Sequence, residues 1–309
     1  MKIGIIGTGA VGGYFGAKLF KTGFEIVFIG TKKSTETIKE TGFFIKSPDG
    51  DIEIKEPNIS SSYKSIEDCD LILVCTKAYN TKEIAEGIKD FLGSKAIVLS
   101  LQNGVENEEI LSSVLGKEKI IPASIYLSAA AEKPGLINHA GSGRIILGEF
   151  SKEETERIKK IKEIFDKANI PTKISPNLFH DMWKKLIVNS AYNGMTAVIG
   201  TPLTKINEVT EAKQLYFDIL KEGQNVAKAE GIEISDSEVE KLFSMLEQPV
   251  FINFKSSTLQ DFEKRKPLEI DAIQGSLIKI GQKHNIKTPL NKTIYALLKL
   301  KEASFEQSK

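Results

Sequence analysis

The sequence predicts an α/β domain followed by an all-α domain. Over the first part of the chain, short apolar runs alternate with helical patterns, which is typical of a sheet with mostly parallel strands. After Pro171 and Pro176 the sequence contains no convincing strand, and only long helical patterns remain, from about residue 178 to residue 301. A length of 309 residues suits two domains of roughly 150 residues each better than one core. We therefore place the domains at residues 1–174 and 175–309.

The elements expected in the first domain follow from apolar runs and from the turn residues between them. Strands are expected at residues 3–6, 25–29, 71–75, 96–101, 120–127 and 144–147. A helix follows the first strand and extends to about Thr22, and an amphipathic helix is expected at residues 151–168. Pro48-Asp49-Gly50 separates two extended segments, 43–46 and 51–55, and predicts a hairpin.

Charge and cysteine content exclude several classes of protein. The 42 basic and 41 acidic residues nearly cancel, and no basic block has the density of a nucleic-acid-binding surface. Cys69 and Cys75 form no disulfide framework, and three scattered histidines lack the neighbours of a metal site. No segment reaches the length of a membrane span, and a strand starts at residue 3, where a signal peptide would lie. We therefore expect a cytoplasmic protein with a small-molecule partner, and no metal, nucleic acid or membrane.

A glycine-rich loop stands directly between the first strand and the first helix. Its residues have the spacing GxGxxG: Gly7, Thr8, Gly9, Ala10, Val11 and Gly12. The first glycine permits a tight turn, the second lets the backbone approach a pyrophosphate, and the third allows the helix to pack closely on the strand. A simple glycine-rich turn is the alternative, but this position favours the dinucleotide-binding loop of a Rossmann-type domain.

The end of the second strand indicates which cofactor is bound. NAD-binding domains place an acidic residue there, whereas a basic residue suits the 2′-phosphate of NADP(H). In this chain the strand is followed by Thr31, Lys32 and Lys33, and the nearest carboxylate, Glu36, lies too far along. We expect Lys32, helped by Thr31, to bind the 2′-phosphate. The alternative is that the two lysines only keep a surface loop soluble.

Lys77 and Asn103 each follow a predicted buried strand. Ligands of doubly wound sheets bind beyond the carboxyl ends of the strands, where an asparagine can both donate and accept hydrogen bonds. Asn103-Gly104 is also a common turn pair, so a purely structural role is the alternative for Asn103.

One helix of the second domain carries a polar stripe on an otherwise apolar surface. Lys185, Asn189 and Asn193 have the spacing i, i+4 and i+8, which puts them on one face. Asparagine is a poor residue for a helix interior, so the stripe indicates the wall of a polar cleft, with a solvated face as the alternative. Lys184 lies on another face and is expected to reach solvent or a phosphate at the rim.

A third polar group consists of Ser257 and the segment Leu268-Glu269-Ile270-Asp271. The carboxylates of this segment could simply begin a helix, where they interact favourably with the helix dipole. Spacing alone therefore does not select these residues as functional.

Taken together, these residues resemble the ketopantoate reductase family, the 2-dehydropantoate 2-reductases. The glycine loop is common to many dehydrogenases, so the resemblance depends on four other pieces that occur in order: Lys77-Ala78, Asn103-Gly104, Trp183-x-Lys185-x₃-Asn189-x₃-Asn193 and Ser257-x₁₁-Glu269-Ile270-Asp271. It implies an N-terminal Rossmann-type NADP-binding domain and a helical catalytic domain of the type found at the C-terminus of 6-phosphogluconate dehydrogenase. The resemblance does not determine whether the protein forms a homodimer.

The resemblance also implies roles for individual residues. Lys185 would be the general acid that protonates the ketone oxygen, and Glu269 would hold the nicotinamide ribose and orient the lysine. Asn103 would contact both cofactor and substrate, and Lys77 would line the cofactor side. The 2-oxo acid would be bound by Asn189, Asn193 and Ser257. The chain departs from the family at Thr31-Lys32, where arginine is frequent, and at Thr258, where methionine is frequent.

The implied activity is NADPH-dependent reduction of 2-dehydropantoate (ketopantoate) to pantoate, a step toward pantothenate and coenzyme A. A lysine suits the role of acid because its unperturbed pKa, about 10.4, keeps it protonated at neutral pH. One alternative is the reduction of another branched or bulky 2-oxo acid. Another is a catalytically silent NADPH-binding sensor, against which the presence of both Lys185 and Glu269 argues.

Overall fold

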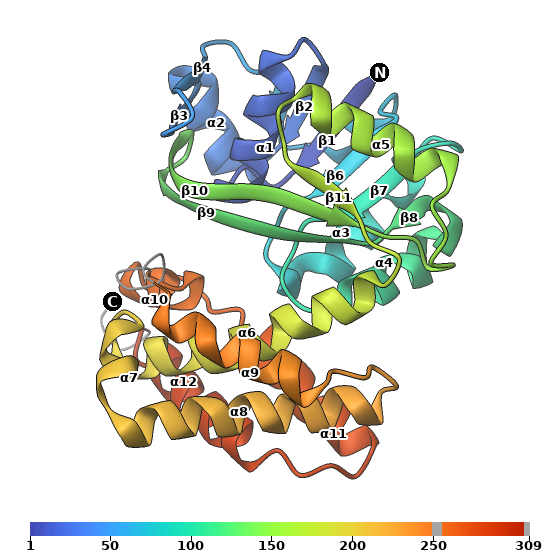
Figure 1. Ribbon diagram of the computed structural model, residues 1–309. Coiled ribbons are helices and arrows are strands. Elements are labelled where there is room, and N and C mark those ends of the chain that lie inside the picture. Colours follow the sequence, from blue (N-terminus) through green and yellow to red (C-terminus); the bar gives the residue numbers. More distant parts are fainter. Residues whose placement is uncertain (249–254, 306–309) are drawn as a thin grey trace. The chain divides into compact units, whose positions relative to one another are not determined.

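The chain forms two compact units in a computed structural model that describes residues 1–248 and 255–305. The first unit contains Met1–Gln102 and Asn107–Leu178, and the second contains Asn103–Glu106 and the chain from Phe179 onward. The first is an α/β unit and the second is helical, so the predicted fold class is confirmed (Figure 1).

A six-stranded parallel sheet forms the centre of the first unit, in the order β5-β2-β1-β6-β7-β8. Its strands are β1 (Lys2–Ile6), β2 (Glu25–Ile29), β5 (Ile59–Ser60), β6 (Leu71–Val74), β7 (Ile97–Ser100) and β8 (Ile120–Ile121). The chain starts in the middle of the sheet and adds strands first on one side and then on the other, as in Rossmann-type domains. Ligands of such sheets bind where this order reverses, at the carboxyl ends of β1 and β6.

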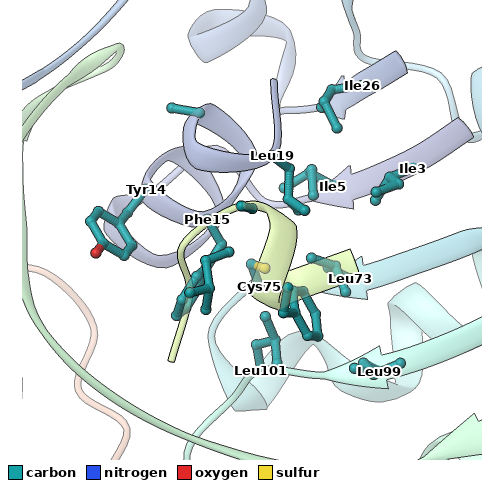
Figure 2. Packing of buried hydrophobic residues seen from close by; sticks show 14 of the residues in the cluster. Ile3, Ile5, Tyr14, Phe15, Leu19, Ile26, Leu73, Cys75, Leu99 and Leu101 are labelled. Carbon is teal, nitrogen blue, oxygen red and sulfur yellow. The ribbon is translucent and has the colours of Figure 1, made fainter. Parts of the chain in front are cut away.

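Helices pack on this sheet through apolar side chains. They are α1 (Ala10–Lys21), α2 (Lys32–Thr41), α3 (Thr81–Ile88), α4 (Asn107–Leu115) and α5 (Glu156–Lys167), with 3₁₀ turns η1 (Tyr63–Ile66), η2 (Ala78–Asn80), η3 (Lys89–Phe91) and η4 (Lys117–Lys119). Figure 2 shows Leu19 of α1 beside Ile5 of β1, with Phe15 of α1, Leu73 of β6 and Leu99 of β7 in the same cluster. All five side chains are fully buried, which fixes α1 against the sheet.

A second sheet, in the order β11-β10-β3-β4 with β9 paired to β10, contains the largest differences from the sequence-based expectation. Its strands are β3 (Phe43–Lys46), β4 (Ile52–Ile54), β9 (Ala123–Lys133), β10 (Leu136–Leu147) and β11 (Thr172–Ile174). The β3–β4 hairpin is confirmed. Strands occur in the regions where they were expected at 120–127 and 144–147, but those bounds were wrong, because β9 and β10 form a long antiparallel hairpin (Figure 1). The expected absence of strands after Pro171 was also wrong, because β11 pairs with β10.

Small residues make this hairpin difficult to predict from the alternation of apolar and polar side chains. Ser128, Ala129 and Ala130 give β9 little alternation between apolar and polar side chains, and glycines interrupt β10. The space left by a missing side chain in β10 is occupied by a side chain of α1. A Cβ at Gly143 would lie 2.4 Å from the hydroxyl oxygen of Tyr14, a buried residue of α1.

The second unit packs its helices around an apolar core. They are α6 (Leu178–Ile199), α7 (Thr204–Glu208), α8 (Thr210–Ala229), α9 (Asp236–Ser244), α10 (Ser257–Glu263), α11 (Ser276–Lys283) and α12 (Pro289–Ala303), with a 3₁₀ turn η5 (Met245–Glu247) and a π-helical turn η7 (Asp271–Gly275). Trp183 of α6 is 4% exposed, which confirms its role in the core. Within the described ranges, no helix is both long enough and apolar enough to cross a membrane.

Candidate functional site

In the first unit, two glycines of the loop between β1 and α1 are required by the packing of the protein itself. Gly7 has φ +101°, and its N–H donates to the carbonyl oxygen of Ile29 at 2.8 Å. A Cβ at Gly7 would lie 2.9 Å from the carbonyl carbon of Cys75, and one at Gly12 would lie 1.9 Å from the carbonyl oxygen of Gly7. These are the tight turn and the close helix–strand contact that the sequence predicts.

Gly9 has a different environment. A Cβ at this position would meet no described atom within 4 Å, so packing within the described chain does not require a glycine here. Gly9 is the N-cap of α1, and no side chain of the described residues caps this helix. The start of α1 therefore offers backbone N–H groups and an open approach to an anionic group, which fits the pyrophosphate of a dinucleotide.

Hydroxyl groups join the glycine loop to the start of α2, a helix that the sequence analysis did not predict. Thr31 caps α2, since its Oγ1 accepts from the N–H of Ser34 at 3.2 Å and donates to Ser34 Oγ at 3.1 Å. Thr8 Oγ1 donates to the same Ser34 Oγ at 3.3 Å. Lys32 is the first residue of α2, directly follows the cap residue Thr31, and is exposed.

Gln102 is a candidate that sequence reasoning missed. It is 6% exposed, and its Nε2 donates to the carbonyl oxygens of Thr76 at 3.1 Å and Lys77 at 3.2 Å. Its Oε1 accepts from Thr81 Oγ1 at 3.2 Å and from Ser100 Oγ at 3.1 Å. The amide thus ties the ends of β6 and β7 together and holds the backbone of Lys77. The signal in the sequence was a lone polar residue at the end of a buried strand.

In the second unit, the structure brings Asn103 and Glu269 together. Asn103 Nδ2 donates to Glu269 Oε2 at 3.2 Å, although the two residues lie 166 positions apart. Glu269 is 6% exposed, so this hydrogen bond satisfies part of a buried carboxylate. Asn103 follows β7 in sequence but belongs to the helical unit by its contacts.

Residues on both sides of Glu269 are anchored to α12. The N–H of Leu268 donates to Glu302 Oε1 at 2.7 Å. Asp271 accepts from Tyr295 Oη at 2.5 Å and from Lys299 Nζ at 2.9 Å. Partial burial opposes the ionisation of Asp271, but these two hydrogen bonds outweigh it and lower its pKa. Glu269 therefore lies on a short, well-held segment that leads into the π-helical turn η7, a feature frequent at functional sites.

The polar stripe of α6 has the predicted register. Lys185, Asn189 and Asn193 share one face of the helix, with Lys185 and Asn189 half-buried and Asn193 only 3% exposed. Asn193 Nδ2 donates to Ser257 Oγ at 3.4 Å, which joins the stripe to the first residue of α10. Ser256, the N-cap of α10, supports this contact through a 2.8 Å hydrogen bond with Thr196 of α6.

Lys184 is paired with carboxylates, which the sequence analysis did not anticipate. Its Nζ lies 3.4 Å from Asp181 Oδ1 and 3.4 Å from Glu238 Oε1, and its side chain is 26% exposed. His180 Nε2 is 3.3 Å from the same Glu238 oxygen. Partial burial opposes the ionisation of Glu238, but hydrogen bonds from Ser235 together with these cations lower its pKa to about 2. The sequence analysis did not anticipate these ion pairs because the carboxylates come from another turn of α6 and from α9.

The second unit therefore combines an ammonium group, a buried carboxylate, three amides and a hydroxyl. Amides and hydroxyls can bind a carboxylate or a hydroxyl of a small molecule, and an ammonium can protonate an oxygen that gains negative charge. Among the described residues, no cluster of His, Cys, Asp or Glu could hold a metal ion.

Comparisons with known proteins extend over both units. The family model described as "Ketopantoate reductase PanE/ApbA" matches residues 3–152, and "Ketopantoate reductase PanE/ApbA C terminal" matches residues 177–302. A 2-dehydropantoate 2-reductase of Pyrococcus horikoshii is 32% identical over 303 residues, which cover 98% of each chain. An uncharacterized oxidoreductase of Bacillus subtilis is 28% identical over 304 residues, 98% of this chain and 99% of the relative.

Solved structures give the same picture. A PanE/ApbA family ketopantoate reductase from Ralstonia eutropha is similar with a TM-score of 0.91 and 31% identity, covering 99% of this chain and 100% of that one. D-mandelate dehydrogenase, solved with NADH and anilino(oxo)acetate, is similar with a TM-score of 0.91 and 27% identity over the same shares. The similar proteins thus include enzymes named for two different substrates.

Proposed function

Since the chain belongs to the ketopantoate reductase family and is an oxidoreductase of that family, we propose that it reduces 2-dehydropantoate to pantoate with NADPH. This reaction is a step toward pantothenate and coenzyme A. The observation that carries the proposal is the hydrogen bond between Asn103 and Glu269, in the unit whose helix α6 presents Lys185. That contact joins two residues that, by the resemblance, would both contact the cofactor.

The cofactor would be held mainly by the first unit. The open start of α1 at Gly9 fits the pyrophosphate, and Lys32 would bind the 2′-phosphate beside the cap formed by Thr31. Lys77, whose backbone Gln102 holds, would line the cofactor side. When bound, the nicotinamide supplies the hydride that adds to the ketone carbon.

Lys185 would supply the proton. As the carbonyl oxygen gains negative charge, the ammonium stabilises that charge and then transfers a proton from Nζ to the oxygen, which completes the alcohol. Glu269 would hold the nicotinamide ribose and keep the ammonium of Lys185 aligned. Asn103 donates to one oxygen of Glu269 and so limits the positions that this carboxylate can adopt.

The substrate would be bound along the face of α6. Asn189 and Asn193 would hydrogen-bond the carboxylate and the hydroxyl end of the 2-oxo acid, together with Ser257. The 3.4 Å hydrogen bond between Asn193 and Ser257 supports this grouping, because it keeps an amide and a hydroxyl side by side at the start of α10.

A second candidate is an NADH-dependent or NADPH-dependent reductase of another bulky 2-oxo acid. This candidate is supported by the similarity to D-mandelate dehydrogenase, which has the same TM-score as the similarity to a ketopantoate reductase. The chemistry at Lys185 would be unchanged, and only the residues that contact the substrate side chain would differ. A catalytically silent NADPH sensor remains the third alternative, and the presence of Lys185 and Glu269 argues against it.

The test is the rate of oxidation of NADPH and NADH by the purified protein with a panel of 2-oxo acids. The panel contains 2-dehydropantoate, the 2-oxo acid that corresponds to mandelate, and short unbranched acids. We expect the highest kcat/KM for 2-dehydropantoate with NADPH. A higher value for the aryl acid would favour the second candidate. Cofactor binding without turnover of any acid would contradict both and favour the sensor.

A further inference from the structure

We infer that Glu106 and Ser276 are positioning residues that hold the segment Asn103–Glu106 on the helical unit and thereby orient Asn103 toward Glu269. The consequence for catalysis rests on the proposed function, whereas the anchoring itself does not. The segment is short and distinct, since the chain leaves the first unit after Gln102 and returns to it at Asn107.

Three of the four residues of this segment, Asn103, Val105 and Glu106, contact the rest of the second unit. Asn103 donates to Glu269 at 3.2 Å, and Gly104 has φ +105°, a left-handed conformation that favours glycine. Val105 packs against the apolar core of the second unit. The segment is therefore attached at three of its four residues rather than at one point.

Glu106 makes the strongest polar attachment. Its Oε2 accepts from Ser276 Oγ at 2.8 Å, and its Oε1 accepts from Lys279 Nζ at 2.5 Å. Lys279 is 74% exposed, so this ion pair contributes little in water. Ser276 is 1% exposed and sits at the start of α11. Its hydroxyl has two acceptors, Glu106 Oε2 at 2.8 Å and the carbonyl oxygen of Ala272 at 3.1 Å, and the nearer of the two is the charged one. The serine rather than the lysine determines where Glu106 lies.

The two polar contacts fall at opposite ends of the segment and on opposite sides of one turn. Asn103 contacts Glu269, which precedes η7, and Glu106 contacts Ser276, which follows η7. The segment thus lies along the π-helical turn with both ends fixed. If Glu106 were released, the segment would lose its polar attachment at one end, and the amide of Asn103 would be less tightly constrained relative to the Glu269 carboxylate.

The anchoring is tested by hydrogen exchange of peptides that cover residues 101–107. The variants are Glu106→Ala and Ser276→Ala, with Glu230→Ala as the matched control. Glu230 also pairs with a lysine of α11, Lys283, and its side chain is 30% exposed against 29% for Glu106. We expect faster exchange of these peptides in the two test variants and none of this change in the control. Unchanged exchange in Glu106→Ala would overturn the anchoring.

The positioning role is tested by a double-mutant cycle between Glu106 and Asn103. We expect Glu106→Ala to lower kcat/KM by about 10-fold to 100-fold, because small displacements near reacting groups are costly. Glu106→Gln should restore most of the activity, because its amide oxygen still accepts from Ser276. If Glu106 acts through Asn103, Glu106→Ala should have little further effect in the Asn103→Ala background.

Effects that multiply in the double variant would overturn the positioning role. The positioning role would also be overturned if Glu106→Ala were as active as Glu230→Ala. A wild-type protein that turns over no acid of the panel would contradict the proposed function instead. In that case the exchange experiment alone decides whether Glu106 and Ser276 hold the segment.

Discussion

Two adjacent lysines of α6 give the sharpest test of the site. Lys184 and Lys185 have the same chemistry, but the structure places their side chains in different surroundings. Lys184 lies 3.4 Å from each of two carboxylates, those of Asp181 and Glu238. Lys185 shares its helix face with Asn189 and Asn193. Replacing each lysine by alanine in turn therefore separates an ion pair from a general acid.

The expected magnitudes differ by orders of magnitude. Removal of a general acid typically lowers the rate by about 10²–10⁴, which corresponds to about 3–5.5 kcal/mol of activation free energy. We expect Lys185→Ala to lose kcat on this scale. The ion pairs of Lys184 are partly exposed, so their loss should cost about 0–1 kcal/mol of the free energy of unfolding. We therefore expect Lys184→Ala to keep most of its kcat, with a Tm lower by at most about 2–4 °C.

Three measurements on both variants make the comparison. They are kcat at saturating NADPH and 2-dehydropantoate, the Kd for NADPH from fluorescence titration, and Tm from circular dichroism. Lys185→Ala should remain folded and should bind NADPH, so that its defect lies in turnover. If Lys184→Ala lost turnover and Lys185→Ala kept it, the helix-face argument would be wrong, and the roles proposed for Asn189 and Asn193 would be wrong with it.

Three further predictions concern cofactor binding and stability. Lys32→Ala should raise the Kd for NADPH and leave that for NADH nearly unchanged, and equal losses for both would show that Lys32 does not bind the 2′-phosphate. Gln102→Leu leaves the carbonyls of Thr76 and Lys77 without their buried donor, so urea unfolding should show a loss of about 1–3 kcal/mol, together with weaker cofactor binding. The lowered pKa of Glu238 means that its stabilising contribution is present above the unfolded pKa, about 4.3, and is lost as pH falls toward 2. The urea midpoint of the wild type should therefore fall more steeply between pH 5 and pH 3 than that of Glu238→Gln, and parallel curves would contradict the assignment.

Much of the fold was predictable because its signals are local. Buried parallel strands are continuous apolar runs, so β1, β2, β6 and β7 were expected close to where they occur. The hairpin of β9 and β10 was not, because its small residues and glycines give a weak alternation. Its length is decided by pairing and by packing against α1, where Gly143 meets Tyr14.

Some residues of the candidate site were likewise predictable from local spacing, and others were not. Lys185, Asn189 and Asn193 could be aligned from the sequence, since helical periodicity alone puts them on one face. The resemblance selected Asn103, Glu269 and Ser257, whereas spacing did not. The signal for Gln102 was weak, a lone polar residue at the end of a buried strand, and no pattern indicated Ser34. The importance of both residues lies in the hydrogen bonds that they make to other segments.

The sequence by itself determined the class of each domain, the glycine loop and the register of the polar stripe, because these depend on neighbours within a few residues along the chain. Tertiary structure alone decided that Asn103 belongs with the helical unit and donates to Glu269, 166 positions away. It also decided that Lys184 pairs with Glu238 of α9. Such contacts depend on how distant segments pack around a shared core, and the periodicity of a single segment carries no record of the partner against which it packs.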